Sequence, residues 1–302
     1  KHLAEAKMAT HPTIEYVVLV GSDEAIPFYR LRDDVTVSNE AEWWPTVGAN
    51  PNTPFGRAVA TGHTFSDDYY VDPDPLLWFG RDLYIPNYPI GRLVETPAEI
   101  RSYLSAYPAT GKVQPQTGLV LGYDFLTDGA EETAASMIGQ GLAVTSVIND
   151  SWTASDLRTA LLGSRKDVAN VNAHFTYNFA IPASLTGGVF LANEIRTTGL
   201  NMSRTLNYSV GCHAGFNLPD RWATSAAAGL DFAQAYMAKG ATYIANTGFG
   251  YGMDDSADLS ELLMLHFQEE LGAPDPQTNL PQDVPVGRAL MRAKQRYFNW
   301  VG

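Results

Sequence analysis

The sequence predicts an α/β protein, built as a three-layer α/β/α sandwich around a mostly parallel sheet. From residue 117 to residue 298, short apolar runs typical of buried strands alternate with longer segments that have the apolar spacing of helices. Strands that alternate with helices pair in parallel through right-handed crossovers, so helices cover both faces of the sheet. With 45% hydrophobic and 18% charged residues among 302, the composition is that of an ordinary globular chain.

The individual elements follow from the same patterns. In the first part of the chain we expect a helix at 2–9, a strand at 14–20, a strand region at 83–93, and a helix that begins after Thr96 and Pro97. In the remainder we expect strands at 117–123, 143–148, 168–173, 206–210 and 242–245. Helices are expected at 129–140, 154–162, 231–239, 259–271 and 286–298.

Residues 29–66 depart from this pattern, because they are polar and rich in Pro and Gly. Such composition predicts a long loop or an irregular insertion. Trp43 and Trp44 lie within it. They either anchor the loop, which is the commoner role of such aromatic residues, or line a substrate cleft.

A Pro- and Gly-bearing connector at 108–115 is the best domain boundary in the sequence. It predicts an N-terminal α/β subdomain at 1–110 and a second subdomain at 111–302. The chain starts at Lys1, within an expected helix and without Met, so we expect it to be an excised or processed part of a longer protein with other domains.

Charge and hydropathy exclude two classes of function. The formal net charge of −13 and the lack of any Lys/Arg stripe argue against a nucleic-acid partner. No run of 18 apolar residues occurs, so we expect no membrane span. The negative charge is compatible with basic substrates, although solubility explains it equally well.

The side chains that could take part in catalysis lie at the ends of two expected strands. Cys212, the only cysteine, follows an apolar run and lies in the turn Gly-Cys-His-Ala-Gly, and His174 ends the run before it. Reactive groups of open α/β sheets collect beyond the carboxyl ends of the strands. Neighbouring strands would bring the imidazole to the thiol and activate it. The alternatives are a cysteine that packs as a small hydrophobe and a histidine that only ends a strand.

An apolar block ending in His, followed by an apolar block ending in Gly-Cys, resembles the caspase-like cysteine peptidases of clan CD. The stretches 16–28, 66–72, 83–100 and 285–298, which include SDDYYVD and the Gly-Arg-Leu piece, make the gingipain family the nearer resemblance. The resemblance implies a caspase-like, mostly parallel sheet with the catalytic pair in the second subdomain. It also implies a bacterial cysteine endopeptidase, secreted or at the cell surface, that acts on protein or peptide substrates with Cys212 and His174.

One departure from the family concerns the oxyanion. The family usually has His-Gly, whereas this chain has His174-Phe175. The backbone N–H groups near Phe175 and Cys212 are still the expected oxyanion donors, without the close approach that glycine allows. This departure favours the alternative function, a noncatalytic binding or regulatory module of a larger surface protein. His213 is not expected to reach the thiol, because consecutive residues of an extended segment point to opposite faces.

The resemblance also assigns supporting roles to acidic residues. Asp124 ends a strand at the same sheet edge, and the matching acid in gingipains orients the histidine. The alternative is an Asp that caps the next turn. Glu131 and Glu132 begin the following helix, where the helix dipole alone explains them. If Glu132 lies at the bottom of the primary specificity pocket, the enzyme cleaves after Arg or Lys.

Two loops complete the expected site. The glycine-rich segment 246–252 resembles the family's pocket wall, with Tyr251 or Phe249 as a platform for a substrate side chain. It lacks the Lys-Ser/Thr of a phosphate-binding loop. An acidic stretch offers carboxylates that suit a structural Ca²⁺, although an acidic turn without metal is the likelier of the two on spacing. The candidate ligands are Asp67, Asp68, Asp72 and Asp74. No redox or organic cofactor is required.

Overall fold

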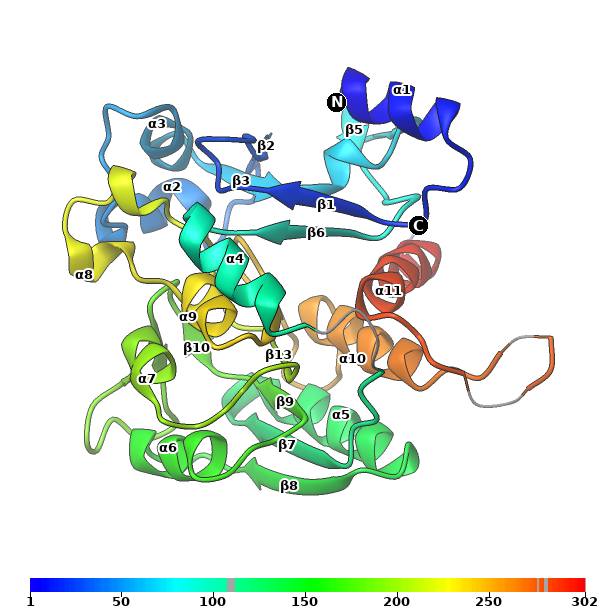
Figure 1. The fold of residues 1–302 in the computed structure, drawn as a ribbon. Coiled ribbons are helices and arrows are strands. Elements are labelled where there is room, and N and C mark those ends of the chain that lie inside the picture. The colour runs from blue at the N-terminus through cyan, green and yellow to red at the C-terminus, as the bar shows by residue number, and fades with distance from the viewer. Residues whose placement is uncertain (108–111, 276, 280–281, 302) are drawn as a thin grey trace.

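A five-stranded parallel sheet forms the centre of the protein (Figure 1). The computed structural model describes residues 1–107, 112–275, 277–279 and 282–301. The sheet has the order β14-β13-β9-β7-β8. Its strands are β7 (Thr117–Gly122), β8 (Ala143–Ile148), β9 (Val168–Val171), β13 (Leu206–Ser209) and β14 (Thr242–Ala245). The predicted parallel sheet is confirmed, and β8 and β14 have the predicted bounds.

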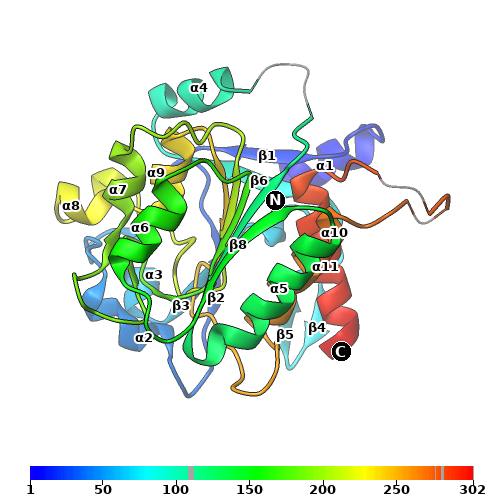
Figure 2. The same cartoon turned by 90° about the horizontal axis from the view of Figure 1, so that it is seen from below.

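Helices cover both faces of this sheet, as the three-layer prediction requires (Figure 2). One face is covered by α6 (Ala154–Leu162), α7 (Ala192–Thr197) and α9 (Phe232–Ala238), and the other by α5 (Thr127–Gly139), α10 (Ser260–Leu271) and α11 (Val286–Val301). The alternation within a strand decides which side chain meets which layer. In β7, Leu119 and Leu121 pack in the α6/α9 core, whereas Val120 packs in the α5/α10 core.

The N-terminal region forms a separate layer across one side of the molecule (Figure 1). Strand β1 (Val17–Val20) pairs in parallel with β6 (Ile90–Leu93). Two antiparallel pairs accompany it, β2 (Tyr29–Arg32) with β3 (His63–Ser66) and β4 (Leu76–Trp78) with β5 (Arg81–Leu83). Its helices are α1 (His2–Thr10), α2 (Glu40–Trp43), α3 (Pro54–Ala60) and α4 (Pro97–Ser105).

The prediction of an irregular segment at 29–66 is wrong in part. The segment contains β2, α2, α3 and β3, and its core is formed by Phe55, Val59 and Phe65. Asn39 and Thr53 cap the two short helices by accepting hydrogen bonds from Ala41 N and Gly56 N. The segment is stabilised by aromatic packing between residues far apart in the sequence, which its local Pro- and Gly-rich composition does not predict.

The connection between the two halves is described only in part. Helix α4 begins as predicted, with a capping box between Thr96 and Glu99 and Pro97 in the first turn. The predicted boundary between residues 110 and 111 lies outside the described residues. In the described part of the chain, no helix is both long and apolar enough to cross a membrane.

Several short elements were not predicted. The His174 region leaves the main sheet and forms a small antiparallel sheet of β10 (His174–Phe175), β11 (Phe179–Ile181) and β12 (Phe190–Leu191). The strand predicted to run to His174 therefore ends three residues earlier, at Val171. The remaining short elements are α8 (Ala226–Gly229) and single 3₁₀ turns at Trp44–Thr46, Asp68–Tyr70, Asp124–Leu126 and Asp220–Trp222.

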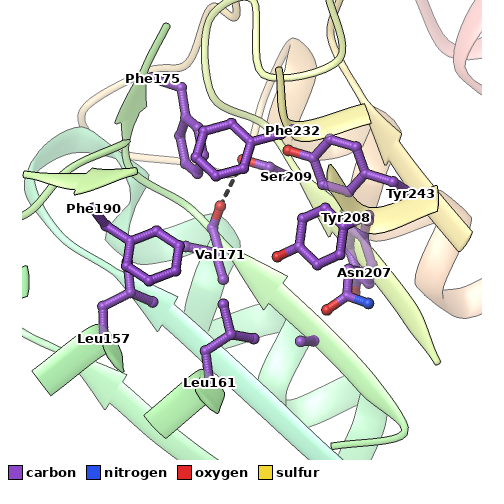
Figure 3. Close-up of a pocket in the computed structure, with 12 residues that line it drawn as sticks. Leu157, Leu161, Val171, Phe175, Phe190, Asn207, Tyr208, Ser209, Phe232 and Tyr243 are labelled. Carbon is purple, nitrogen blue, oxygen red and sulfur yellow. Dashed lines mark hydrogen bonds between the residues drawn. The ribbon is translucent and has the colours of Figure 1, made fainter. Parts of the chain in front are cut away.

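Tight packing supports the sheet just below its carboxyl edge. Figure 3 shows aromatic and aliphatic side chains around a cavity of about 10 Å³, which is no larger than one water molecule requires. The Ser209 hydroxyl donates to the Val171 carbonyl at 2.6 Å and joins the ends of β13 and β9. Phe175 and Phe232 pack edge to face beside it, with ring centroids 5.2 Å apart. The floor beneath the candidate site is therefore rigid.

Candidate active site

The register of three parallel strands aligns the predicted triad. Gly118 of β7 lies opposite Val168 of β9, an offset of 50 residues, and Asp124 precedes His174 by the same number. Val168 lies opposite Leu206 of β13, an offset of 38 residues, and His174 precedes Cys212 by the same number. The three residues thus follow the carboxyl ends of three neighbouring strands, Asp124 in a turn after β7, His174 in β10 after β9, and Cys212 in a turn after β13. We call these three positions the row.

Asp124 and His174 meet at the start of this row. His174 Nε2 lies 3.3 Å from Asp124 Oδ2, and the two side chains are 39% and 58% exposed. Such exposure makes the pair a weak contributor to stability. The rings of Tyr123 and Phe125 lie edge-on to the imidazole, each with its centroid 5.6 Å away. The backbone N–H of Asp124 donates to Asp150 Oδ1 at 2.9 Å, which fixes a turn with a positive φ of 58°.

Cys212 lies at the other end of the row and is half-buried. Its thiol donates to the Gly250 carbonyl at 3.5 Å. Burial raises the pKa of the thiol, and the negative charge of Glu40 raises it further. Among the described residues no hydrogen bond joins Cys212 Sγ to His174. Catalytic contacts in ligand-free enzymes are often long and shorten only with substrate, so this geometry is compatible with a dyad.

Gly211 lets the segments that carry Cys212 and His174 approach each other. A methyl group added at Gly211 would lie 2.3 Å from the Phe175 ring and 2.9 Å from the Ala173 carbonyl oxygen. The segment that carries His174 thus packs directly on the residue before Cys212. Only glycine permits this contact without displacing one of them.

The two expected oxyanion donors differ in their surroundings. The backbone N–H of Cys212 makes no hydrogen bond to another residue in the described parts of the chain. Phe175 is paired with Ala180 in the small antiparallel sheet, and its side chain is buried. An oxyanion beside the Cys212 turn would therefore find at least one N–H group without a protein acceptor.

His213 points away from the thiol, as the sequence predicted. It is buried, with Nε2 2.9 Å from Glu40 Oε2. Its ring stacks on Trp43, with the centroids 3.4 Å apart and the planes at 12°. Trp43 is also buried, so it anchors the N-terminal segment rather than lining a cleft.

The residues expected to bind substrate are placed differently from the prediction. Glu131 and Glu132 lie exposed on α5. The Phe249 ring packs edge-on against His213, with the centroids 4.5 Å apart, and the Tyr251 hydroxyl donates to the carbonyls of Val37 and Ser38. Both rings therefore make contacts within the protein, and their role as a platform for a substrate side chain stays a prediction.

Glu261, a residue that sequence reasoning missed, lies behind this wall. It begins α10 and is only 2% exposed, and its two carboxylate oxygens make no hydrogen bond of ordinary geometry among the described residues. A methyl group on Gly129 would lie 2.5 Å from Oε1, and one on Gly252 would lie 2.4 Å from Oε2. The Phe125 ring, which also contacts His174, lies against Gly252. The carboxylate is thus enclosed between the start of α5 and the loop after β14.

The electrostatics of Glu261 are those of an isolated buried acid. Burial raises its pKa to about 8, the nearby N–H groups of Gly129 and Met253 oppose this only in part, and the charges of Asp128 and Asp258 add to the rise. In the sequence, Glu261 looks like an ordinary first-turn acid. The signal that could have found it is the apolar run directly after it, LLMLHF, on a helix with little polar surface.

The four acidic residues expected near Ca²⁺ do not converge. Asp67 pairs with Arg92 at 2.6 Å and Asp68 with Lys294 at 2.7 Å. Asp72 accepts from the backbone N–H of Asp74 and of Ile85. Within the described ranges no group of three or more His, Cys, Asp or Glu side chains could hold a metal ion. A calcium ion stays a prediction.

Comparison with known proteins identifies the fold. No family model matches the chain, and no curated protein matches it in sequence. The crystal structure of the Arg-specific cysteine proteinase gingipain R superposes with a TM-score of 0.59 at 15% identity, over 98% of this chain and 62% of that one. The fold matches that of gingipain R. A structure described as a protease gives 0.53 at 10% identity, over 95% of this chain and 64% of that one.

The match to gingipain R confirms the predicted caspase-like fold. At such low identity it establishes the fold alone, and membership of the gingipain family stays a prediction. The chain spans less than two thirds of the length of either structure. Activity, substrates and partners are therefore proposals, argued from the site.

Gly211→Ala should destabilise the protein. The added methyl group would overlap the Phe175 ring, and overpacking of this kind costs about 1–3 kcal/mol. The free energy of unfolding in urea measures the effect. The control is Gly139→Ala at the end of α5, where a methyl group meets no atom within 4 Å. It should be neutral or slightly stabilising, and equal stability of the two variants would contradict the packing described.

Glu261→Gln should stabilise the protein, and more so as the pH rises. The folded-state pKa of about 8 exceeds the ordinary value of 4.5, so ionisation in the folded state destabilises wild type. This cost is absent below pH 4.5, grows between the two pKa values, and reaches about 3 kcal/mol near pH 7. Unfolding in urea at pH 5 and pH 8 measures it. Glu132→Gln, an exposed control, should show no such pH-dependent gain.

Proposed function

We propose that the protein is a cysteine endopeptidase with Cys212 as nucleophile, His174 as general base and acid, and Asp124 as the residue that orients His174. The observation that supports this proposal is that the three residues follow the ends of the neighbouring strands β7, β9 and β13, with His174 Nε2 3.3 Å from Asp124 Oδ2. A thiol, an imidazole and a carboxylate in that order make up the activated nucleophile of a covalent hydrolase.

The mechanism follows from the placement of these groups. His174 takes the Cys212 proton, and the thiolate attacks the scissile carbonyl to form the C–S bond. The Cys212 N–H, with the expected donor near Phe175, stabilises the oxyanion. His174 then gives its proton to the leaving amine, and Asp124 stabilises the imidazolium in between. A water molecule, deprotonated by His174, hydrolyses the thioester and restores the thiol. These steps require no redox or organic cofactor.

We further propose cleavage after Arg or Lys, with Glu261 rather than Glu131 or Glu132 as the acid that receives the basic side chain. Glu261 is buried and unpaired beside the loop that contacts Cys212, whereas the other two are exposed. The charged groups that act on Glu261 most strongly are Asp128 and Asp258, which are also acidic, and in the described part of the chain no Lys or Arg forms an ion pair with it. Gingipain R is described as Arg-specific, in line with a basic substrate.

The alternative is a noncatalytic binding or regulatory module with the same fold. The raised pKa of the Cys212 thiol and the His174-Phe175 sequence favour it. A secreted or cell-surface bacterial location, a structural calcium ion and further domains of a longer chain are proposed with either function. They rest on the sequence resemblance.

Cys212→Ala should abolish peptide cleavage and leave the fold intact. Removing the nucleophile of a covalent hydrolase lowers kcat by at least about 10³-fold. Hydrolysis of a fluorogenic library varied at the residue before the scissile bond, with and without a calcium chelator, measures activity. Circular dichroism provides the folding control. Equal cleavage by a clean Cys212→Ala preparation would exclude the proposed mechanism, and a wild type that cleaves nothing would favour the noncatalytic module.

Glu261→Gln should lower kcat/KM for Arg and Lys substrates by about 10- to 10³-fold, because a buried charge pair is lost. Substrates with an uncharged side chain at that position should be affected little. For wild type, kcat/KM with Arg substrates should rise with pH up to about 8, where Glu261 becomes ionised. Glu261→Gln should lose that rise.

Glu131→Gln and Glu132→Gln are the matched controls, because they remove one exposed charge each. They should keep the preference for Arg and Lys. If Glu132→Gln loses that preference and Glu261→Gln keeps it, the original assignment to α5 is right. A wild-type preference for Asp or Asn would remove the pocket assignment altogether and leave the peptidase proposal standing.

A further inference from the structure

We infer that Glu40, in the N-terminal region, is a positioning residue for the Cys212 turn. Its carboxylate joins the residue after Cys212 to the loop that contacts the thiol. The His213 Nε2–H donates to Glu40 Oε2 at 2.9 Å, and the Phe249 N–H donates to Oε1 at 2.9 Å. Glu40 and His213 are buried, at 2% and 1% exposure. The meaning of this contact for catalysis rests on the peptidase function proposed above.

The backbone at this point needs an external constraint. His213 adopts a positive φ of 57°, a conformation that costs energy for a residue other than glycine. Its N–H donates to the Gly248 carbonyl at 2.8 Å. A methyl group on Gly248 would lie 2.5 Å from Glu40 Oε1, so the loop lies directly on the carboxylate. Glu40 thus joins the Cys212 turn to the loop after β14 through both of its carboxylate oxygens.

Helix α2 presents two side chains to one imidazole. Glu40 and Trp43 are three residues apart, on the same side of the helix. Glu40 bonds the edge of the His213 ring, and Trp43 stacks on its face. Asn39 caps the helix, and the Glu40 N–H donates to Asp33 Oδ2 at 2.9 Å. The carboxylate is therefore fixed before it meets His213.

The charge of Glu40 opposes the proposed chemistry. It raises the pKa of the Cys212 thiol, after the larger effect of burial. Burial also lowers the pKa of His213, so its imidazole is neutral and bonds Glu40 as a donor. Tyr251 of the same loop also interacts electrostatically with the thiol. The segment that carries His174 approaches the turn at Gly211, where the Phe175 ring lies. The Glu40 carboxylate therefore disfavours the thiolate by its charge. Its role is explained by its contacts, because it joins the Cys212 turn to the loop after β14.

The experiment measures the alkylation rate of Cys212 by iodoacetamide against pH, and peptide turnover in parallel. Cys212 is the only cysteine, so alkylation reports on this thiol alone. Glu40→Gln keeps an acceptor for Phe249 and a donor for the other tautomer of His213, but removes the charge. Its alkylation midpoint should move to lower pH, with kcat within a few-fold of wild type. Glu40→Ala loses both contacts and should lower kcat at least about 10-fold, more than it changes KM.

Glu42→Gln is the matched control, because Glu42 is exposed on the same helix. It should change neither the midpoint nor kcat. The inference is overturned if Glu40→Ala turns over like wild type, or if Glu40→Gln loses as much activity as Glu40→Ala and leaves the midpoint unmoved. If no variant cleaves peptides but Glu40→Gln still shifts the midpoint, the peptidase proposal fails and the contact between Glu40 and the Cys212 turn stands.

Discussion

The candidate site depends on the register of three parallel strands. A slip of one residue in β7 or β9 would turn every side chain to the opposite face and break the row of Asp124, His174 and Cys212. The register is fixed by apolar packing on both faces, with Leu119 and Leu121 in one core and Val120 in the other. The chemistry at the edge is thus set by the hydrophobic pattern of the strands.

Glu40 and Glu261 are both buried, but they differ in their hydrogen-bond partners. Glu40 uses both carboxylate oxygens within the protein, at 2.9 Å each, so a ligand has nothing to add there. Glu261 makes no hydrogen bond of ordinary geometry among the described residues, and the nearby N–H groups of Gly129 and Met253 offset only part of the cost of burial that its raised pKa records. A folded chain retains such a cost where a partner arrives from outside. This contrast is the reason why we propose a positioning role for Glu40 and a substrate-binding role for Glu261.

The parts of the fold that follow from local pattern could be predicted from the sequence. Strand β8, helix α6 and strand β14 have the predicted bounds, because apolar spacing and the Thr153 cap mark them. The strand ends also predicted that His174 and Cys212 follow neighbouring strands, whereas their pairing as a dyad stays a prediction. Glu40 and Glu261 could not be predicted in this way. Glu40 meets His213 across 173 residues of sequence, and Glu261 is enclosed by loops that pattern analysis does not place.

Local sequence patterns also do not show which way the side chains of a helix face, and this applies to the two acids that the sequence predicted in a specificity pocket. Glu131 and Glu132 follow Asp124 closely, but the rotation of α5 turns them to solvent and turns Gly129 inward. Each residue is rotated by about 100° from the one before it, so closeness in sequence to Asp124 does not decide which side chain of the first helical turn faces inward. The buried acid beside Gly129 and Gly252 is Glu261 of α10, more than 120 residues later in the sequence.

Under the proposed function, the surroundings of Cys212 and His174 also bear on when the thiol would become nucleophilic. Asp124, which would stabilise a charged His174, is exposed and therefore screened by water, whereas the burial of Cys212 and the charge of Glu40 disfavour the thiolate. Under the proposed function, proton transfer from Cys212 to His174 would thus be opposed before a peptide binds. A peptide laid along the carboxyl edge would exclude water from Asp124 and His174 and strengthen their attraction, because the local dielectric constant falls. Under the proposed function, substrate binding itself would shift the proton, and the empty enzyme would keep its thiol protonated.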